Sequence, residues 1–333
     1  MRYQSLNKII YLVIPCYNEE EVLPETSKRL KEKMGCLISS GKISNQSKIM
    51  FVNDGSKDKT WEIMQQLYKA DKIFSCVNLS RNKGHQAALL AGLFTAYKFA
   101  DAVISLDADL QDDIEAVDKF IDEFYSGYDI VYGVRNSRKT DSVFKRFTAQ
   151  SFYRLMKMMG VEIIYNHADY RLMSKRAIES LTQFEEVNMF LRGIIPLIGY
   201  PSTKIEYARQ KRFAGKTKYS LRKMFSFAFE GISSFSVKPI KLIKNLGLLI
   251  FLGSIALSIY YLIGFLTGKT VEGWTSLMIS IWMLGGIQLF CVGIVGEFVG
   301  KVYLETKKRP RYFIESILND VNFEEKIVDV DNK

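Results

Sequence analysis

The sequence predicts an α/β protein, with a mostly parallel, doubly wound sheet in its first part and a membrane-associated segment after it. Through residues 8–134, short apolar runs alternate with helical patterns, and the links between them are short. Such alternation is typical of parallel sheets covered by helices. Two uncharged stretches follow, at residues 245–268 and 273–296. Each has about 24 residues, enough for a helix to cross about 30 Å of hydrocarbon.

The expected strands are short, apolar and partly β-branched, and polar turns bound them. The expected helices lie between the strands. In such a sheet the carboxyl ends of the strands form the edge where ligands bind, so the loops after the strands are candidates for a functional site. We expect strands at residues 8–14, 48–52, 73–79, 102–106 and 128–134, and helices at residues 20–34, 57–70, 86–99 and 114–125.

The motif DADLQ, residues 107–111, follows the fourth expected strand. Its carboxylates, Asp107 and Asp109, stand one residue apart and project into the crevice at the strand end. With the side-chain oxygen of Gln111 they offer hard oxygen ligands, which suit Mg²⁺ or Mn²⁺ and leave positions for water and phosphate. The alternative is a polar loop that only caps the next helix.

The loop PCYNE, residues 15–19, leaves the first expected strand at the same edge. Pro15 stiffens the exit from the strand because its ring fixes φ. Tyr17 can stack on a base, and Glu19 can accept hydrogen bonds from a base or a ribose. The loop therefore has groups suited to a nucleotide.

The loop NDGSKD, residues 53–58, leaves the second strand. Asp54 can accept the imide N–H of a uracil, and Gly55 permits a tight turn. Asp58 is placed to cap the following helix, and a capping loop explains this motif as well as a ligand site does. A third loop, RNKG, adds the positive charge of Lys83 to the same rim. The glycines match neither a Walker nor a dinucleotide fingerprint, which disfavours ATPases and dehydrogenases.

The amino-acid composition further limits the class of protein. The 4 cysteines have no paired short spacing, which argues against a zinc site or a disulfide framework and suits a reducing compartment. With 2 histidines, catalysis by several histidines is not expected. The N-terminal apolar run is short and ends without a small-residue cleavage site, so we expect no signal peptide.

The net charge of +10 is concentrated in residues 201–245, directly before the first uncharged stretch. A nucleic-acid site is one explanation, but the position beside a membrane span favours an anionic membrane surface or a phosphorylated ligand. Against Glu206 and Glu230, this stretch contains Lys204, Arg209, Lys211, Arg212, Lys216, Lys218, Arg222, Lys223, Lys238, Lys241 and Lys244.

Several motifs occur in an order that resembles the inverting glycosyltransferases of family two, which have a GT-A fold. They are IPCYNEE, VNDGSKDKT, LSRNKGHQAALLAGL and DADLQDD. Two later motifs, ADYRLMSKRA and RFAGKTKYS, are similar to those of the bactoprenol-phosphate glycosyltransferases and of dolichyl-phosphate mannose synthase. The resemblance covers almost the whole chain. One departure is Asp112-Asp113, where the family often has prolines, and we expect it to alter a turn and not the chemistry.

The resemblance implies roles on the donor side of a GT-A site. Asp109 and Gln111 would hold the divalent ion. Asp107 would contact the ribose or lie just outside the metal's direct ligands. Asp109 thereby takes part in catalysis. The remaining nucleotide-sugar contacts implied are Pro15, Tyr17, Glu19, Asp54 and Lys83.

On the acceptor side, the resemblance implies that Arg135 lies near the phosphates and that Asp169 lies in a loop beside the reacting centre. Asp169 is either a general base or a group that orients a substrate, and an ordinary surface pair with Arg171 is the plain alternative. Arg171, Arg212 and Lys218 would bind the acceptor phosphate. For RFAGKTKYS the alternative is a solvated basic loop.

The second part of the chain predicts a membrane anchor. Residues 219–237 mix large apolar side chains with few charges, which is typical of an interfacial helix, although a core helix shows similar periodicity. Lysines flank the two uncharged stretches, so both ends of the resulting transmembrane hairpin are expected in the cytoplasm. The expected domains are a catalytic domain at 1–218, interfacial helices at 219–244, two transmembrane helices within 245–300 and a cytoplasmic tail at 301–333.

The resemblance implies a multi-pass enzyme of the cell membrane that transfers one sugar from a UDP-sugar to polyprenyl phosphate at the cytoplasmic face. We expect glucose, with N-acetylglucosamine or galactose as alternatives, and a flippase and a second glycosyltransferase downstream. The oligomeric state, including a homo-oligomer, stays open. A processive polysaccharide synthase would carry a Gln-x-x-Arg-Trp motif, and no tryptophan here follows an arginine. A non-catalytic scaffold would not need DADLQ, and we expect no nucleic-acid partner.

Overall fold

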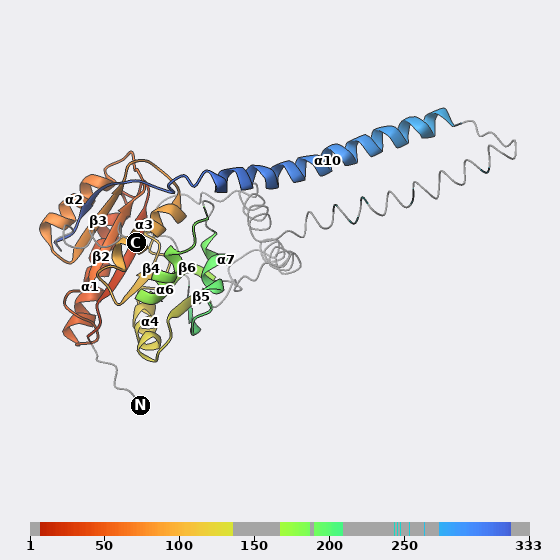
Figure 1. Ribbon diagram of the computed structural model, residues 1–333. Helices are drawn as coiled ribbons and strands as arrows, with labels where there is room; N and C mark the ends of the chain where they lie inside the picture. Colours follow the sequence, from red (N-terminus) through yellow and green to blue (C-terminus); the bar gives the residue numbers. More distant parts are fainter. Residues whose placement is uncertain are drawn as a thin grey trace. The chain divides into compact units, whose positions relative to one another are not determined.

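The computed structural model describes four ranges and five isolated positions, and the chain divides into two compact units. The first unit comprises Met1–Gln150, Ile163–Tyr219 and Pro310–Lys333, and the second Ser151–Glu162 and Ser220–Arg309. Figure 1 shows the elements of both units. The described residues are 7–135, 167–186, 190–208 and 273–320, with positions 243, 245, 247, 253 and 263.

The described part of the first unit forms an eight-stranded sheet in the order β7-β5-β6-β4-β1-β2-β3-β8. The central strands β3, β2, β1 and β4 are parallel, as the alternating sequence pattern predicts. The strands are β1 (Ile10–Cys16), β2 (Lys48–Asn53), β3 (Phe74–Leu79), β4 (Ala102–Ser105), β5 (Ile130–Arg135), β6 (His167–Ser174), β7 (Ser202–Tyr207) and β8 (Ile314–Leu318).

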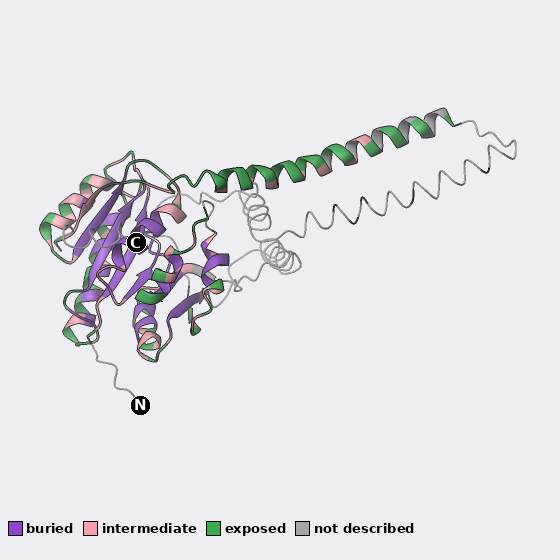
Figure 2. Cartoon of the chain, in the orientation of Figure 1, coloured by how far each residue is buried: buried purple, intermediate pink, exposed green. Residues whose placement is uncertain are grey.

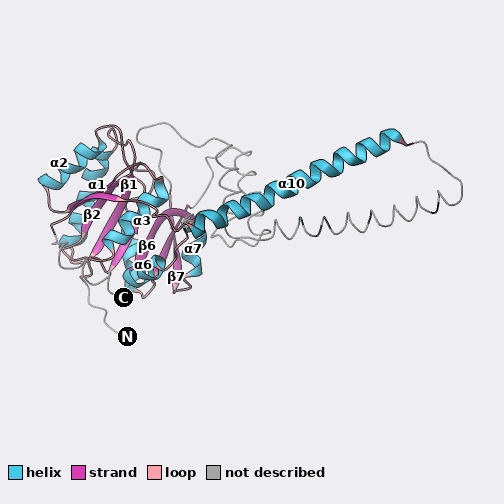
Figure 3. Cartoon of the chain, turned by 45° about the horizontal axis from the view of Figure 1, so that its top comes forward, coloured by secondary structure: helices cyan, strands magenta, loops and turns pink. Residues whose placement is uncertain are grey.

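Helices cover both faces of this sheet, as a doubly wound fold requires. Leu30, Met64 and Phe120, from three different helices, belong to one buried cluster with Leu12 of β1. Alternate residues of a strand face opposite sides. Accordingly, Val13 faces α3 (His85–Ala96), which lies on the side of the sheet that also holds α6 (Figure 3). The other helices of this unit are α1 (Leu23–Ser39), α2 (Thr60–Ala70), α4 (Ala116–Tyr125), α6 (Lys175–Thr182) and α7 (Leu191–Leu197).

The helix expected from residue 20 begins later, at Leu23. The backbone N–H groups of Val22 and Leu23 both donate to the carbonyl of Glu19, so the preceding residues form a turn. Pro24 then occupies the first helical turn, where a missing N–H does no harm. Because α1 begins at Leu23, Glu19 stays in the loop after β1, where the sequence predicts nucleotide binding.

Strand β6 corrects the expectation that Asp169 lies in a loop. It runs antiparallel to both β4 and β5, which makes the sheet mixed. Tyr170 and Leu172 belong to the buried cluster on the face that packs against Phe120 of α4 (Ala116–Tyr125), and Asp169 and Arg171 therefore face the opposite side. The pattern of a strand was obscured in the sequence because one of its alternate faces is charged.

Strand β8 lies in the segment that the sequence analysis assigns to a cytoplasmic tail. It pairs antiparallel with β3, with Val77 opposite Ile317. The Asn78 side chain donates to Glu315 Oε2 at 2.7 Å, and the Ser80 N–H donates to the carbonyl of Phe313 at 3.0 Å. Residues 314–318 are thus an edge strand of the catalytic sheet.

In the second unit the structure describes the helix α10, Trp274–Thr306, of 33 residues. Its segment Ile287–Thr306 has a mean hydropathy of 1.6, and none of the side chains described in it is buried; by length and composition it is able to cross a membrane. In Figure 2, exposed residues, coloured green, occur along the whole length of α10. Apart from isolated positions, the stretches 219–244 and 245–268 lie outside the described residues. One candidate span is therefore described, and the two-helix hairpin stays a prediction.

We predict that β8 stabilises the catalytic unit. A chain that ends at Arg309 loses the β3–β8 ladder and the Asn78–Glu315 bond, each hydrogen bond contributing about 1 kcal/mol net. We expect its melting temperature, followed by circular dichroism in detergent, to fall by roughly 5 °C or more. A chain that ends at Asp320 retains β8 and should melt with the full chain. Equal melting of both truncations would contradict the prediction.

Candidate active site

The loops after β1 and β2 are joined by hydrogen bonds. The Asp54 N–H donates to the carbonyl of Cys16 at 2.9 Å. Asn18 donates from its N–H to Ser56 Oγ at 3.0 Å, and its side chain accepts from the Lys57 N–H at 2.9 Å. The two predicted nucleotide loops therefore form one rim. On that rim Tyr17 and Glu19 are half-buried, whereas Pro15 is buried within β1.

Asp54 connects this rim to the third loop. Its carboxylate accepts hydrogen bonds from the backbone N–H groups of Lys83, at 2.7 Å, and Gly84, at 2.9 Å. Burial raises the pKa of Asp54, although these two bonds oppose the rise. Asp54 thus holds the start of α3, and its contact with a uracil stays a prediction. Asp58 accepts from the N–H of Thr60, the first residue of α2, at 3.1 Å, but it lies one position before the N-cap, which is Lys59 and makes no side-chain cap bond.

Gly55 is required for this junction. It has φ of 62°, and a Cβ there would lie 2.4 Å from the backbone N of Asn82. A side chain would both strain the left-handed backbone and displace the third loop. The tight turn predicted at Gly55 is confirmed, and its second reason is the close approach of the neighbouring loop.

The acidic motif has an unusual backbone. Leu110 has φ of 56°, a region that non-glycine residues rarely adopt and that clusters at functional sites. This turn allows the Gln111 N–H to donate to Asp109 Oδ1 at 3.1 Å. Asp109 is buried, while the Asp107 side chain is 37% exposed. Desolvation raises the pKa of Asp107, with His85 opposing and Asp169 and Asp109 adding to the rise.

The donor set of this motif fits a hard divalent ion. Asp109 and Gln111 offer a carboxylate and an amide oxygen at a strand end, and Asp107 offers another carboxylate nearby. Within the described ranges no three His, Cys, Asp or Glu side chains gather into a metal cage. Mg²⁺ is commonly held by one or two carboxylates together with substrate phosphates, so a full protein cage is not needed.

Asp169 is the centre of a second charged group. Arg171 Nη2 lies 2.5 Å from Asp169 Oδ1, and Arg192 of α7 contributes Nε at 3.3 Å and Nη2 at 3.1 Å. Burial works to raise the pKa of Asp169, but Arg192 and Arg171 outweigh it and hold the pKa well below its ordinary value. Asp169 is therefore an anion at neutral pH and a weak proton acceptor.

Arg171 lies behind Asp169 and not at the surface. Its side chain is 1% exposed, and among the described residues its Nε and Nη1 have no hydrogen-bond partner. A buried guanidinium needs a counter-charge, and Asp169 provides it. The geometry thus supports a role for Arg171 as the charge partner of Asp169. A direct contact of Arg171 with an acceptor phosphate stays a prediction.

Two residues of this site were missed by the sequence analysis. His85, the first residue of α3, places Nε2 3.7 Å from Asp107 Oδ1 and 3.8 Å from Asp169 Oδ2. Arg192 is the other. Each had a signal: His85 opens a helix after a polar loop, and Arg192 is the charged residue in the apolar run FLRGIIPLI. Arg212 and Lys218 lie outside the described residues, so their phosphate contacts stay predictions.

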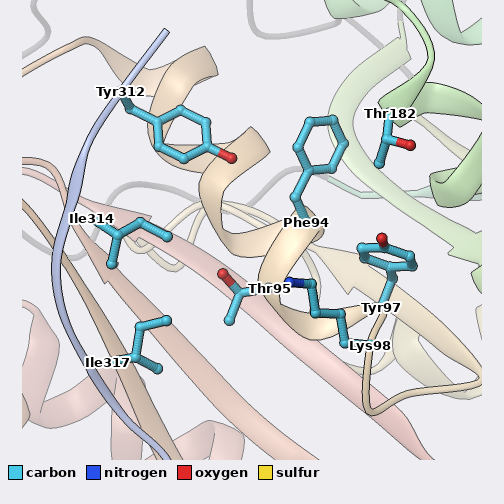
Figure 4. Close-up of a pocket in the computed structure, with 8 residues that line it drawn as sticks. All are labelled: Phe94, Thr95, Tyr97, Lys98, Thr182, Tyr312, Ile314 and Ile317. Atoms are coloured by element: carbon cyan, nitrogen blue, oxygen red, sulfur yellow. The ribbon is translucent and has the colours of Figure 1, made fainter. Parts of the chain in front are cut away.

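A separate hollow of about 410 Å³ lies at the opposite end of α3 (Figure 4). Its lining includes Phe94 of α3 and Tyr97, the residue directly after α3, together with Tyr312 and Ile314 from the segment around β8. Burial raises the pKa of Tyr312 to about 12, so its phenol is neutral. The hollow is mostly apolar and does not include the charged residues of the site.

A mixed α/β sheet with an Asp-x-Asp loop at the carboxyl end of β4, beside nucleotide-type loops, is the arrangement of a nucleotide-sugar transferase with a GT-A fold. The family model "Glycosyl transferase family 2" matches residues 11–182. The chain belongs to this family and is a glycosyltransferase.

Known relatives resemble the chain over most of its length. The "Uncharacterized glycosyltransferase YkoT" of Bacillus subtilis (strain 168) is 52% identical over 307 residues, 92% of this chain and 91% of that protein. The "Prophage bactoprenol glucosyl transferase homolog" of Escherichia coli (strain K12) is 38% identical over 310 residues, 92% of this chain and 99% of that protein.

Among solved structures, the mannosyltransferase PcManGT from Pyrobaculum calidifontis, in complex with GDP-Man and Mn²⁺, is similar at a TM-score of 0.45. Its sequence is 11% identical, and the match covers 92% of this chain and 89% of that chain. The family assignment rests on the sequence matches.

We predict that Gly55→Ala lowers the free energy of unfolding by about 1–3 kcal/mol and weakens UDP binding, because the third loop must move. Urea unfolding and calorimetry measure the two effects. Gly41→Ala is the matched control, since Gly41 has φ of 69° but nothing within 4 Å of an added Cβ. If the two variants lose equal stability and both retain UDP affinity, the contact with Asn82 is unimportant.

Proposed function

We propose that this glycosyltransferase transfers one sugar from a UDP-sugar to a polyprenyl phosphate, with inversion at the anomeric carbon. Glucose is the first candidate sugar, and N-acetylglucosamine and galactose are the alternatives. The 38% identity to the protein named "Prophage bactoprenol glucosyl transferase homolog" supports this assignment, because it extends over 92% of the chain and thus beyond the matched family domain.

The observation that carries the proposal is the pairing of the Asp169 carboxylate with the two guanidinium groups of Arg171 and Arg192. Arg171 and Arg192 keep its pKa low, which makes it a poor general base. A sugar hydroxyl acceptor must lose its proton during transfer, whereas a phosphate monoester is already ionised at neutral pH. A site whose central carboxylate is a weak base therefore suits a phosphate acceptor. Asp169 then orients its arginine partners and the substrates.

On the donor side, Asp109 and Gln111 would hold Mg²⁺ or Mn²⁺, which when bound offsets the charge of the departing diphosphate. The Asp107 side chain is partly exposed and would contact the ribose. Tyr17 and Glu19, on the joined rim, would bind the base. Asp54 stabilises this arrangement through its hydrogen bonds to the loop that contains Lys83.

On the acceptor side, Arg135 ends β5 at the crevice and would contact phosphate. Arg135 retains its positive charge. Burial lowers the pKa of Arg135, but Tyr207 and Asp112 outweigh this effect and raise it. Arg212 and Lys218 would draw the lipid phosphate towards the site. The nucleophile is then a phosphate oxygen, which attacks the anomeric carbon opposite the UDP leaving group.

The membrane location follows from α10 in this proposal. Its large apolar side chains are exposed, among them Leu289 at 76% and Val292 at 67%, and an apolar surface of this length needs a cover. Lys301, Lys307 and Lys308 at its end favour a cytoplasmic position for that end. A lipid phosphate at the cytoplasmic face would then reach the catalytic unit with its tail still in hydrocarbon.

The proposal is tested by incubating the purified full chain with undecaprenyl phosphate and UDP-glucose, UDP-N-acetylglucosamine or UDP-galactose. We expect one UDP-sugar, UDP-glucose first, to give a glycosyl-phosphate lipid that mass spectrometry identifies. Undecaprenol, which lacks the phosphate, is the matched acceptor control and should give no product. Transfer to undecaprenol or to a free sugar, with none to the phosphate, would overturn the proposal.

We predict that Asp109→Ala lowers the transfer rate by about 10²–10³, the usual loss when one electrostatic stabiliser of the transition state is removed. EDTA should have the same effect on the unchanged chain, with Mg²⁺ or Mn²⁺ restoring transfer. Asp113→Ala is the control, because the Asp113 side chain accepts a bond from the Glu115 N–H, and the bonds that its carbonyl accepts from Tyr170 and Ala116 are unaffected by the substitution. Full activity in excess chelator would contradict the metal assignment.

We predict that residues 269–272 lie outside the cell. On a background without the native cysteines, Thr270→Cys should react with a membrane-impermeant thiol reagent in intact cells. Asn45→Cys, at an exposed position of the catalytic unit, should react only after permeabilisation. The reverse labelling pattern would show the opposite topology.

A further inference from the structure

We propose that Asp112 and Tyr207 are positioning residues that hold the guanidinium of Arg135 for phosphate binding. The inference rests on the proposed function for the identity of the acceptor. Its test can be carried out on nucleotide binding as well. The sequence pattern predicts that Asp112-Asp113 alters a turn and not the chemistry. In the structure the Asp113 side chain accepts a bond from the Glu115 N–H, whereas Asp112 faces Arg135 and Tyr207.

The three side chains form one polar group. The Tyr207 hydroxyl donates to Asp112 Oδ1 at 2.6 Å, and Arg135 Nε donates to the Tyr207 oxygen at 3.3 Å. Arg135 Nη2 lies 3.8 Å from the same Asp112 oxygen. Two of the three guanidinium nitrogens therefore face this pair, which limits the orientations that the Arg135 side chain can adopt.

Each partner comes from a different part of the fold. Arg135 ends β5, Tyr207 ends β7 directly opposite it in the parallel register, and Asp112 lies in the loop after β4. The approach of β7 is fixed at Gly133, where an added Cβ would lie 3.1 Å from Tyr207 Cε1 and 2.8 Å from the carbonyl of Tyr170. The hydroxyl of Tyr207 is thus placed by packing and not by its own flexibility.

Burial distinguishes this group from an ordinary surface pair. Asp112 is 4% exposed and Tyr207 is 2% exposed, whereas the Arg135 side chain retains 29% exposure. The inner two residues are inaccessible to a substrate, and the outer one can still reach it. This is the geometry of a supported functional side chain, in which the support is itself locked by packing.

Asp112 is also incompletely satisfied. Among the described residues its Oδ2 has no hydrogen-bond partner, although it is buried. Burying a carboxylate with an unpaired oxygen is unfavourable, and such groups in native proteins call for an explanation. Holding the charge of Arg135 provides one, because Asp112 is the acidic group within 4.0 Å of that guanidinium in the described residues.

The position of Arg135 relative to the metal loop supports a role in phosphate binding. Arg135 Nη2 lies 3.8 Å from Asp112, the residue that directly follows Gln111, so the guanidinium lies beside the acidic motif. A phosphate between that motif and β5 would lie beside a cation whose direction Tyr207 and Asp112 set. Charge-assisted bonds from arginine depend strongly on orientation, because the guanidinium is a planar fork.

A double-mutant cycle tests the inference in the full-length protein. We expect Tyr207→Phe to lower kcat/KM for undecaprenyl phosphate about tenfold, as loss of a hydrogen bond to a charged group does. Asp112→Asn should also lower it, because the counter-charge of Arg135 is lost. In an Arg135→Ala background, however, Tyr207→Phe should have less than about a twofold effect, since the group that it positions is gone.

Tyr68→Phe is the matched control. It removes the same hydroxyl from a tyrosine that also donates to an aspartate, Asp320, at 2.9 Å, and it lies on α2 near the β8 edge. We expect unchanged kinetics from this variant. Melting temperatures identify variants that fail to fold, and if Asp112→Asn is one of them, Tyr207→Phe and its double variant still decide the question.

The outcomes separate the two proposals. If the unchanged chain does not glycosylate undecaprenyl phosphate, the proposed function fails, and the same cycle is then measured on calorimetric UDP affinity in the presence of Mg²⁺. Non-additive losses by either measurement support the positioning role. Losses in the Arg135→Ala background as large as in the native background would overturn it, as would a Tyr207→Phe variant that behaves like Tyr68→Phe in both measurements.

Discussion

The site depends on the two hydrogen bonds that Asp54 accepts from the backbone of Lys83 and Gly84. They join the loop after β2 to the start of α3, and so determine where the first residue of that helix lies. His85 is consequently placed beside Asp107, in the loop after β4, and Asp169 of β6. Through His85, the buried side chain of Asp54 thus links the positions of the nucleotide loops, the acidic motif and β6. The cost of burying it is offset by backbone donors that would otherwise lack partners.

Much of this arrangement could be predicted because its determinants are local. Strand and helix patterns located the parallel core, and the polar residues after each strand identified the rim, including the turn at Gly55. Asp58 bonds to the first residue of α2, as a capping side chain would, but it lies one position before the N-cap. The parallel order then brings the loops to one edge without further information. The DADLQ motif lies where that reasoning places it, although the left-handed Leu110 within it has no sequence signal that we recognise.

The rest could not be predicted because it depends on long-range pairing. Asn78 and Glu315 are 237 positions apart, and no local pattern marks residues 314–318 as part of the sheet. Strand β6 contains Arg171, whose burial contradicts the usual expectation for arginine, and only Asp169 beside it explains that burial. Arg192 and Tyr207 reach the site from elements whose direction the sequence does not specify. Pairings between charged groups were the least predictable part of the site.

The position of β8 has a consequence for biosynthesis. This strand follows α10 in the chain, yet its partner β3 belongs to the first part of the sheet. During translation the edge of β3 is left unpaired until residues beyond 313 have emerged, and an open strand edge is a surface on which chains aggregate. The catalytic unit is therefore completed only after the apolar helix has been made. A nascent chain that stops within α10 would carry an unfinished sheet, which a quality-control protease or chaperone can recognise.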